Sequence, residues 1–536
     1  MSAASARRAK PVAVRPPRLI AVIDVGASAI RMDIAELGGP EDVRILDSLA
    51  RSASLGRDTF NAGRIEPETT EACVGILRDF RQAAEEYAGE TGSPISIRAV
   101  GTSALREAEN RDAFLDRVFI ATGIHVEPIE EPEVHRLTYM ALHRLMGDQP
   151  FMKRGDVLVA EVGGGGTKML LIQDGFVTCS ETFRLGSLRV REALETDDES
   201  EAHTEEALGR QIERTLDQIR RTVPVKRAPH LVAVLGDLPA TLMSALGAGP
   251  AGAGRPFVGA LDVKTFMRAR EIAEKSESEL VRDYGLSPRE AAAAGPALMT
   301  YVSLAREFRV KTVSLARVDL RLGLLFNEVM RGAWTAHFSE QIIRSALALG
   351  AKYAFDKPHA LHVTELAVRL LREVASDHNL EPRHEILLRV AGILHDIGAF
   401  VSSRSHHKHS SYLIASSELF GLTTRDTALI ALVARYHRRS PPAPSHPEFV
   451  RLDREDRALV LQLSAVLRVA DALDRSHSQR IRIAGFLRTG DELSLGVEDV
   501  GDLSLERVAL ETKGGLFETV YGMRVTLRPT VMPGIR

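Results

Sequence analysis

Cysteine is scarce in this 536-residue chain, and long apolar runs are missing. The two cysteines, Cys73 and Cys179, lie far apart in sequence, which excludes a disulfide framework and indicates a reducing cytoplasm. No run of about 18 apolar residues occurs, so the sequence predicts no membrane-spanning helix. Residues 1–17 are basic and contain prolines but no apolar stretch, which predicts a flexible tail rather than a secretory signal.

A large excess of charge of one sign is also lacking. The 69 lysine and arginine residues nearly balance the 72 aspartate and glutamate residues, so that the net charge is −3. This balance gives no general attraction to nucleic acid or to a membrane surface, and we expect neither as a partner. Hydrophobic residues make up 44% of the chain and charged residues 26%, as in globular domains, and the length accommodates about three or four domains.

Two segments far apart in the chain share one pattern. LIAVIDVGASAIRMDIA, from residue 19, and VLVAEVGGGGTKMLLIQDGFV, from residue 157, are each typical of a strand, a glycine turn and a second strand. Glycines after a strand free backbone N–H groups to cradle phosphate. The repetition predicts a duplicated, two-lobed α/β fold, with lobes at 18–137 and 138–328 whose glycine loops face each other across a cleft.

The rest of the chain has a different character. Residues 329–480 contain apolar helical stripes, as in HVTELAVRLLREV. The stripe in that segment consists of Val363, Leu366, Ala367, Leu370, Leu371 and Val374. Residues 481–536 alternate as short strands with polar turns. The sequence therefore predicts an all-α domain followed by a small, β-rich α+β domain at the C-terminus.

Five segments carry a family resemblance. In chain order they are AVIDVGASAIRM, LGRDTFNAGRI, AVGTSALREAENRDAFLDRV, AEVGGGGTKM and FRLGSLRVRE. With the helical region after residue 328, they resemble the exopolyphosphatase/guanosine pentaphosphate phosphatase family, whose N-terminal part has an actin-like, duplicated ribonuclease H-like fold. The resemblance implies a hydrolase, a homodimer, and polyphosphate or a guanosine penta- or tetraphosphate as the ligand.

The same resemblance implies which residues contact phosphate, through hydroxyl, guanidinium and backbone donors. They are Asp24, Gly26, Arg31, Thr102, Ser103, Arg106, Gly163, Gly164, Gly165, Thr167 and Lys168. Lys168 stands where the family has an acid. It either donates directly to a phosphate, which would give a metal-free binding site, or is a solvated residue at the end of a hairpin.

The catalytic glutamate of the family is replaced in this chain. In EEPEVHRL, alignment of Arg136 and Leu137 puts Val134 at its position, and a valine cannot accept a proton. Glu133 is adjacent, but in extended backbone it would point to the opposite face. The cleft is therefore predicted to be degenerate. In the alternative, Glu133 or Glu131 replaces the missing base and exopolyphosphatase activity survives.

The helical region contains GILHDIGAF, with the His–Asp pair that names the HD phosphohydrolase superfamily. His395 and Asp396 are the predicted catalytic pair. The surrounding residues resemble the H…HD…D core of that superfamily, with the extra histidines that bind a second metal or a phosphate. The implied metal ligands are His359, His395, Asp396, Asp471, His409 and His437.

Several of these positions have rivals in the sequence. His362 competes with His359, His406 and His407 compete with His409, and His437 can instead cap a helix. Imidazole and carboxylate ligands suit Mn²⁺, Mg²⁺, Fe²⁺, Zn²⁺ or Ni²⁺. We therefore predict metal-dependent hydrolysis in the helical domain. A third hypothesis is a non-catalytic sensor of polyphosphate or alarmone.

Overall fold

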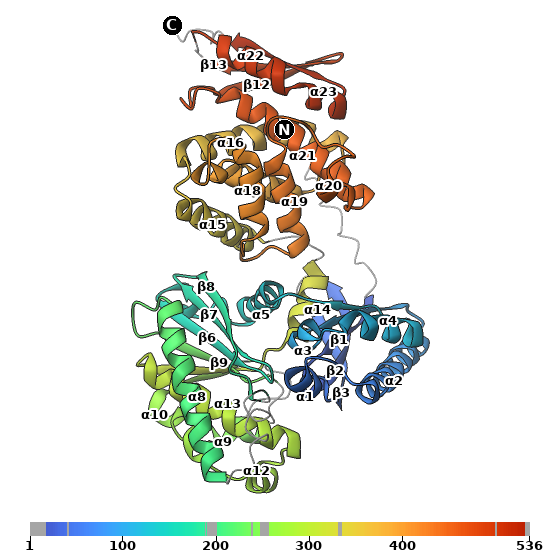
Figure 1. Ribbon diagram of the computed structural model, residues 1–536, viewed down its shortest axis with the longest axis vertical. Helices are drawn as coiled ribbons and strands as arrows, with labels where there is room; N and C mark the ends of the chain where they lie inside the picture. The colour runs from blue at the N-terminus through green and yellow to red at the C-terminus, as the bar shows by residue number, and fades with distance from the viewer. Residues whose placement is uncertain are drawn as a thin grey trace, which may run out of the picture. The chain divides into compact units, whose positions relative to one another are not determined.

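The computed structural model describes residues 18–39, 42–187, 189, 201–236, 240–246, 257–330, 335–498 and 501–530 (Figure 1). The chain forms two compact units, Met1–Arg331 and Gly332–Arg536. The tail predicted at 1–17 lies outside the described residues. In the part of the chain that is described, no helix has the length and hydrophobicity needed to cross a membrane.

The first lobe is built on a five-stranded sheet in the order β3-β2-β1-β4-β5. Alternate residues of β1 face opposite sides, so that Ile23 packs into one core and Val22 into another. The hairpin of β1 and β2 closes at Gly26, and β4 adds in parallel to β1. The elements are β1 (Arg18–Val25), β2 (Ala29–Gly39), β3 (Asp42–Ser52), α1 (Leu55–Ala62), α2 (Pro67–Thr91), β4 (Ile95–Gly101), α3 (Ser103–Glu107), α4 (Arg111–Thr122), β5 (Val126–Pro128) and α5 (Glu131–Met146).

The second lobe repeats this topology. Its six-stranded sheet has the order β8-β7-β6-β9-β11-β10, with a β6–β7 hairpin and with β9 and β11 added in parallel. The duplication predicted from the two glycine turns is thus confirmed. The elements are α6 (Pro150–Lys153), β6 (Asp156–Val162), β7 (Thr167–Gln173), β8 (Phe176–Phe183), α8 (Glu201–Thr222), β9 (His230–Val234), α9 (Ala240–Ala245), β10 (Phe257–Asp262), α10 (Val263–Phe266), α11 (Ala269–Ala273), α12 (Glu277–Tyr284), α13 (Pro288–Glu307), β11 (Thr312–Ala316) and α14 (Leu320–Met330).

Two helices depart from the lobe boundaries predicted from the sequence. Helix α5 runs across the boundary placed at 137/138, and α14, at the end of the unit, packs against α5 and the first sheet. Leu324 of α14 shares a core with Val22 of β1 and Val134 of α5. Val134 and Glu133 lie in the first turn of α5, so the expectation of extended backbone there is wrong. Pro132, at the start of α5, favours this helix start because its missing N–H has no helical partner to lose.

The second unit begins with helices that bury their apolar stripes against one another, including the whole stripe predicted in α16. A small sheet, β12-β13-β14, follows, and α21 packs against both α22 and α23. These last two helices were not predicted by the alternating pattern. The elements are α15 (Ala336–Lys352), α16 (Lys357–Val374), η1 (Ala375–Asp377), α17 (Pro382–Leu394), η2 (Ile397–Phe400), α18 (His406–Ala415), α19 (Thr424–Arg435), α20 (Pro447–Val450), α21 (Arg454–Leu473), β12 (Ile483–Thr489), β13 (Glu492–Glu498), α22 (Ser504–Lys513), α23 (Gly515–Tyr521) and β14 (Arg524–Thr530).

Candidate functional site

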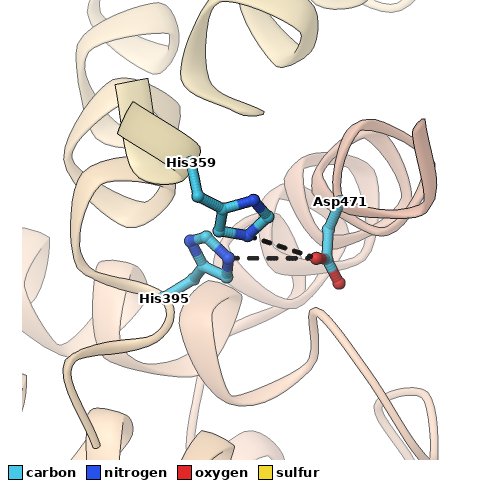
Figure 2. A group of neighbouring side chains, drawn as sticks. All are labelled: His359, His395 and Asp471. Carbon is cyan, nitrogen blue, oxygen red and sulfur yellow. Dashed lines mark ion pairs between the residues drawn. The ribbon is translucent and has the colours of Figure 1, made fainter. Parts of the chain in front are cut away.

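Four residues from three helices meet inside the second unit, and we call them the helical-domain cluster: His359, His395, Asp396 and Asp471. Figure 2 shows how His359, His395 and Asp471 face one another. His359 lies in the first turn of α16, where the side chain of Asp356 caps the helix by accepting from its backbone N–H. His395 and Asp396 follow α17, and Asp471 lies in the last turns of α21. Helix termini thus deliver these polar groups into an otherwise apolar interior.

The spacing of the cluster suits a cation. The Nε2 atoms of His359 and His395 lie 3.8 and 3.9 Å from Oδ1 of Asp471, and 4.0 and 3.7 Å from Oδ2 of Asp396. These distances are too long for hydrogen bonds. They are close to the separation of roughly 3–4 Å between ligands that each lie about 2.1 Å from one metal ion. Both Nε2 atoms are buried without a hydrogen-bond partner.

The imidazole tautomers are set by groups behind the cluster. Nδ1–H of His395 donates to the carbonyl of Gly392 at 2.7 Å, and a carbonyl can only accept. Nδ1–H of His359 donates to Oδ2 of Asp474 at 2.8 Å, and the backbone N–H of Gln479 donates to the other oxygen of Asp474. Each Nε2 is therefore left with a lone pair that points into the cluster, which is the arrangement of a metal-binding histidine. The residues of the cluster fit a divalent metal.

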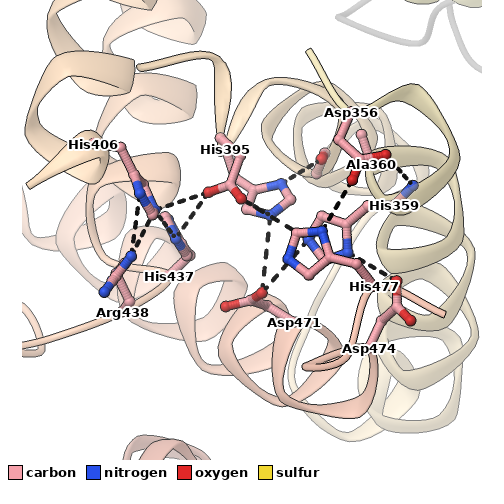
Figure 3. Close-up of polar contacts among 12 residues, drawn as sticks. Asp356, His359, Ala360, His395, His406, His437, Arg438, Asp471, Asp474 and His477 are labelled. Carbon is pink, nitrogen blue, oxygen red and sulfur yellow. Dashed lines mark hydrogen bonds and ion pairs between the residues drawn. The ribbon is translucent and has the colours of Figure 1, made fainter. Parts of the chain in front are cut away.

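A second group of potential ligands shares Asp396 (Figure 3). Oδ1 of Asp396 lies 2.9 Å from Nε2 of His406 and 3.4 Å from Nε2 of His437. Nδ1–H of His437 donates to the carbonyl of Ala434 at 2.6 Å, which leaves its Nε2 for the group. We call His406, His437 and Oδ1 of Asp396 the second ligand group.

The histidine of α18 whose Nε2 approaches Asp396 is His406, a rival of the His409 chosen from the sequence. Both lie in the first turn of α18, but His406 is buried whereas His409 is half-exposed. The helix packs against η2 at Gly398, where a Cβ atom would collide with the backbone of His406 and Ser410. This close approach directs the start of α18, and with it His406, toward Asp396. His362 lies outside both groups, and His359 lies within.

Charge in this region favours cation binding. Burial alone would raise the pKa of Asp396, but His395 and the hydrogen bond from His406 hold it well below its usual range. Burial also opposes ionisation of Asp471, yet Lys513, His437 and His395 lower its pKa to about 2. Burial and the neighbouring His395 lower the pKa of His437 to about 3. Both carboxylates are therefore anionic and His437 is neutral near pH 7, and these are the forms that bind metals.

Three contributors to this site were missed in the sequence. Asp474 lies three residues after Asp471, a helical spacing that could have suggested it, and His477 stacks on His359 with ring centroids 3.7 Å apart. Lys513 reaches Oδ2 of Asp471 from the end of α22 and forms an ion pair with it. No local signal links Lys513 to a residue 42 positions earlier.

The first unit contains a cavity of about 1470 Å³ lined by both lobes, which we call the cleft. Ten of the eleven predicted phosphate contacts line it: Asp24, Gly26, Arg31, Thr102, Ser103, Arg106, Gly163, Gly164, Gly165 and Lys168. Thr167 does not, because it is buried and its hydroxyl donates to the carbonyl of Leu185. A Cβ atom at Gly165 would collide with the hydroxyl of Ser103 across the cleft, so the Ser103 side chain would have to move to admit another residue there.

Glu131 and Glu133, the two acids considered as alternatives to the family's catalytic glutamate, have different surroundings. Val134 and Glu131 line the cleft, and Glu131 accepts from Arg106 at 2.7 Å. Glu133 is not among the lining residues. Its carboxylate accepts two hydrogen bonds, of 2.8 and 2.6 Å, from the buried guanidinium of Arg136. Glu133 thus neutralises a buried cation and faces no space in which a substrate would lie.

His135, next to Val134, makes the stability of the fold sensitive to acid. It is 2% exposed, and burial, with Lys168 and Arg106, lowers its pKa from 6.5 to about 3. Between these values the unfolded chain binds a proton that the folded chain does not, so acidification destabilises the fold. From pH 6.5 to 5 this group should remove about 2 kcal/mol from the free energy of unfolding.

Urea unfolding of the wild type at both pH values, beside His135→Gln, measures this effect. We expect the free energy of unfolding to fall less on acidification in His135→Gln than in the wild type. The reason is that unfolding of the variant takes up about one proton fewer. The exposed His125→Gln serves as the matched control and should behave as the wild type. Equal pH dependence in the wild type and His135→Gln would show that His135 is protonated in the folded chain.

Comparison with known proteins agrees with this division into two units. The sequence model of the Ppx/GppA phosphatase family matches residues 34–331, and that of Ppx/GppA phosphatase domain III matches residues 343–512. A guanosine-5'-triphosphate,3'-diphosphate pyrophosphatase of Photobacterium profundum is 24% identical over 86% of this chain and 88% of its own length. A protein of the same name from Vibrio parahaemolyticus is 23% identical over 90% of this chain and 92% of its own. The crystal structure of an exopolyphosphatase from Cytophaga hutchinsonii matches with a TM-score of 0.51 and 18% identity, over 58% of this chain and 98% of that one, which is a likeness of fold.

Proposed function

This chain belongs to the Ppx/GppA phosphatase family of phosphoanhydride hydrolases, and we propose that it hydrolyses its substrate at the helical-domain cluster. The substrate class that we infer is polyphosphate or a guanosine penta- or tetraphosphate, and the cleft of the first unit would also bind these compounds. The relatives named as guanosine-5'-triphosphate,3'-diphosphate pyrophosphatases support the nucleotide as one candidate. The homodimer implied by the resemblance stays a prediction.

One observation carries the placement of the chemistry. Two imidazole Nε2 atoms are buried without partners in the helical-domain cluster, and leaving such groups unsatisfied costs stability unless a ligand completes them. The described residues that line the cleft form no comparable group of potential metal ligands. Val134 lines it at the position of the family's base, and Glu161 is bound to Lys168. Among the described residues, every group of three or more potential metal ligands lies in the second unit.

The residues of the helical-domain cluster would hold and orient a divalent metal. When bound, such an ion supplies Lewis-acid activation of a phosphoryl group and of water. Asp474 and the carbonyl of Gly392 keep the two Nε2 lone pairs aimed inward, so that little reorganisation accompanies binding. The absence of thiolate favours Mn²⁺, Mg²⁺, Fe²⁺, Zn²⁺ or Ni²⁺ without choosing among them.

Protonation of His359 should make metal binding at the cluster depend on pH. Burial lowers the pKa of His359, but the hydrogen bond to Asp474 and the charges of Asp471 and Asp396 outweigh it and raise the pKa above its ordinary value. Metal binding therefore competes with a proton on His359 and weakens as the pH falls. Arg438, with Nη1 3.0 Å from Nε2 of His406, and Lys513, paired with Asp471, bring positive charge next to the two ligand groups, where it would attract phosphate oxygens.

Phosphate release from polyphosphate and from guanosine pentaphosphate, with Mn²⁺ or Mg²⁺, tests the proposal. Release should vanish in a chelator and in His395→Gln, while the matched control His409→Gln keeps it. Release that survives in His395→Gln would place the chemistry in the cleft, where Glu131 would be the candidate base. Binding of either compound without turnover under every metal would indicate a sensor.

A further inference from the structure

The two strands that flank the glycine loop of the second lobe carry an internal ion pair. Glu161 at the end of β6 and Lys168 at the start of β7 are directly paired in the antiparallel register. The ammonium of Lys168 donates to Oε1 of Glu161 at 2.8 Å, and the two side chains are 24% and 21% exposed. Lys168 therefore lines the cleft with its charge held in place, and the alternative of a solvated hairpin end is wrong.

A further carboxyl group lines the same cleft from the other lobe. Asp24 lies near the end of β1, and its Oδ1 is enclosed without a hydrogen-bond partner. Asp24 and Glu161 thus stand near corresponding ends of the two duplicated strands, and both line the cleft with Lys168. Two carboxylates at the head of a cleft would ordinarily call for a divalent cation. Here an ammonium tethered to the chain supplies positive charge at that place.

The remainder of the cleft suits a long, flexible polyanion. Nine basic side chains and seven acidic ones line it. Its volume of about 1470 Å³ exceeds the roughly 300–1,000 Å³ of pockets for drug-sized ligands, so an extended chain fits. An ammonium has three N–H donors, and Lys168 uses one of them on Glu161, which leaves donors for an anion in the cleft.

We propose that the cleft binds a chain of condensed phosphates without a divalent metal, and that the Lys168 ammonium, held by Glu161, supplies the positive charge that a divalent cation would otherwise bring. The choice of ligand rests on the function proposed above, but the independence from metal rests on the Lys168–Glu161 ion pair in the cleft. Phosphoanhydride chains occur as inorganic polyphosphate and on nucleotides, and the cleft would recognise the chemistry that both share.

Calorimetric titration of the full-length protein with tripolyphosphate, and separately with guanosine pentaphosphate, tests the proposal. Wild type in excess EDTA should bind with an affinity within about threefold of that in Mg²⁺, the latter measured in the His395→Gln background to prevent turnover. Binding of tripolyphosphate alone would identify the inorganic chain as the source, and binding of the nucleotide alone would show that the base is read as well. Loss of affinity by more than about tenfold in EDTA, or no binding in either condition, would overturn the proposal.

Three substitutions of one residue sharpen the test. Lys168→Met should weaken binding in EDTA by about 10–100-fold, because a charge-assisted contact is lost, and Lys168→Arg should retain it. Lys168→Glu should lose binding in EDTA and regain it in Mg²⁺, since two cross-strand carboxylates then stand where the ion pair was. Lys153→Met, on the exposed α6, is the matched control.

Thermal unfolding of each variant separates misfolding from loss of the contact, and the comparison of EDTA with Mg²⁺ needs no substitution at Lys168. Lys168→Met that binds as tightly as wild type would refute the role of the ammonium. Failure of the proposed hydrolytic function would appear differently, as phosphate release that survives in His395→Gln while binding in EDTA is unchanged.

Discussion

Asp396→Ala should lower phosphate release by at least about a thousandfold, the largest loss expected from a single substitution in the second unit. The two oxygens of Asp396 face different partners: Oδ2 faces His359 and His395, and Oδ1 faces His406 and His437. No other residue belongs to both the helical-domain cluster and the second ligand group through separate atoms. Its removal should therefore also lower the amount of Mn²⁺ retained per chain, measured by elemental analysis after gel filtration.

Two histidines on one helix give the matched comparison. His406→Gln removes one member of the second ligand group and should lower release by about a hundredfold, since lost metal ligands and their supports cost 10–100-fold or more. His409→Gln, in the same turn of α18, should stay within about twofold of the wild type, as expected for a surface change. If His409→Gln were the more damaging of the two, the assignment of His406 would be wrong.

Glu133→Ala should destabilise the fold by about 3 kcal/mol and leave phosphate release per folded molecule unchanged. Arg136 is 3% exposed, and Glu133 is its only carboxylate partner among the described residues. Asn327 also accepts from Arg136, at 3.0 Å, but a neutral amide cannot offset the charge. Truncation of Glu133 would leave a buried guanidinium without a counter-ion, which is the costly case for a buried ion pair. Urea unfolding and phosphate release from the same preparation measure the two effects.

The control is Glu127→Ala, which removes a carboxylate paired with Arg98 where both side chains are more than 40% exposed. An exposed pair contributes about 0–1 kcal/mol, so this variant should be close to wild type in stability. Loss of phosphate release in Glu133→Ala, with stability unchanged, would instead support a residual base in the cleft. That result would favour the family's exopolyphosphatase activity over hydrolysis in the second unit.

The local sequence pattern was sufficient to predict those features that a short segment determines. Strand, glycine turn and strand, repeated at two places, predicted the duplicated fold because alternation and glycine freedom act within a few residues. The spacing of His359, His395, Asp396 and Asp471 was informative because each lies at or near a helix end, where a polar group can enter the core. Lys168 was also identified from the sequence, by the charge that it places after four glycines.

The local sequence pattern could not predict contacts between distant segments. The sequence left His406, His407 and His409 as rivals, since all three lie within one helical turn. Only the packing of η2 against α18 at Gly398 turned His406 toward Asp396. Val134 and Glu133 were expected on opposite faces of an extended segment. In the helix that actually forms, Glu133 turns to Arg136 and Val134 to the cleft.

The sequence by itself determined that this chain has two glycine loops, a valine at 134 where the family resemblance places a glutamate, and histidines and carboxylates that could bind a metal. Those properties reside in residue identity and local spacing. Tertiary structure alone decided that Lys513 joins Asp471, that Asp474 orients His359, and that Lys168 is held by Glu161 in the cleft. The physical reason is that an ion pair or a ligand group forms where folded helices and strands bring side chains within a few ångströms, and this proximity depends on packing across the whole unit.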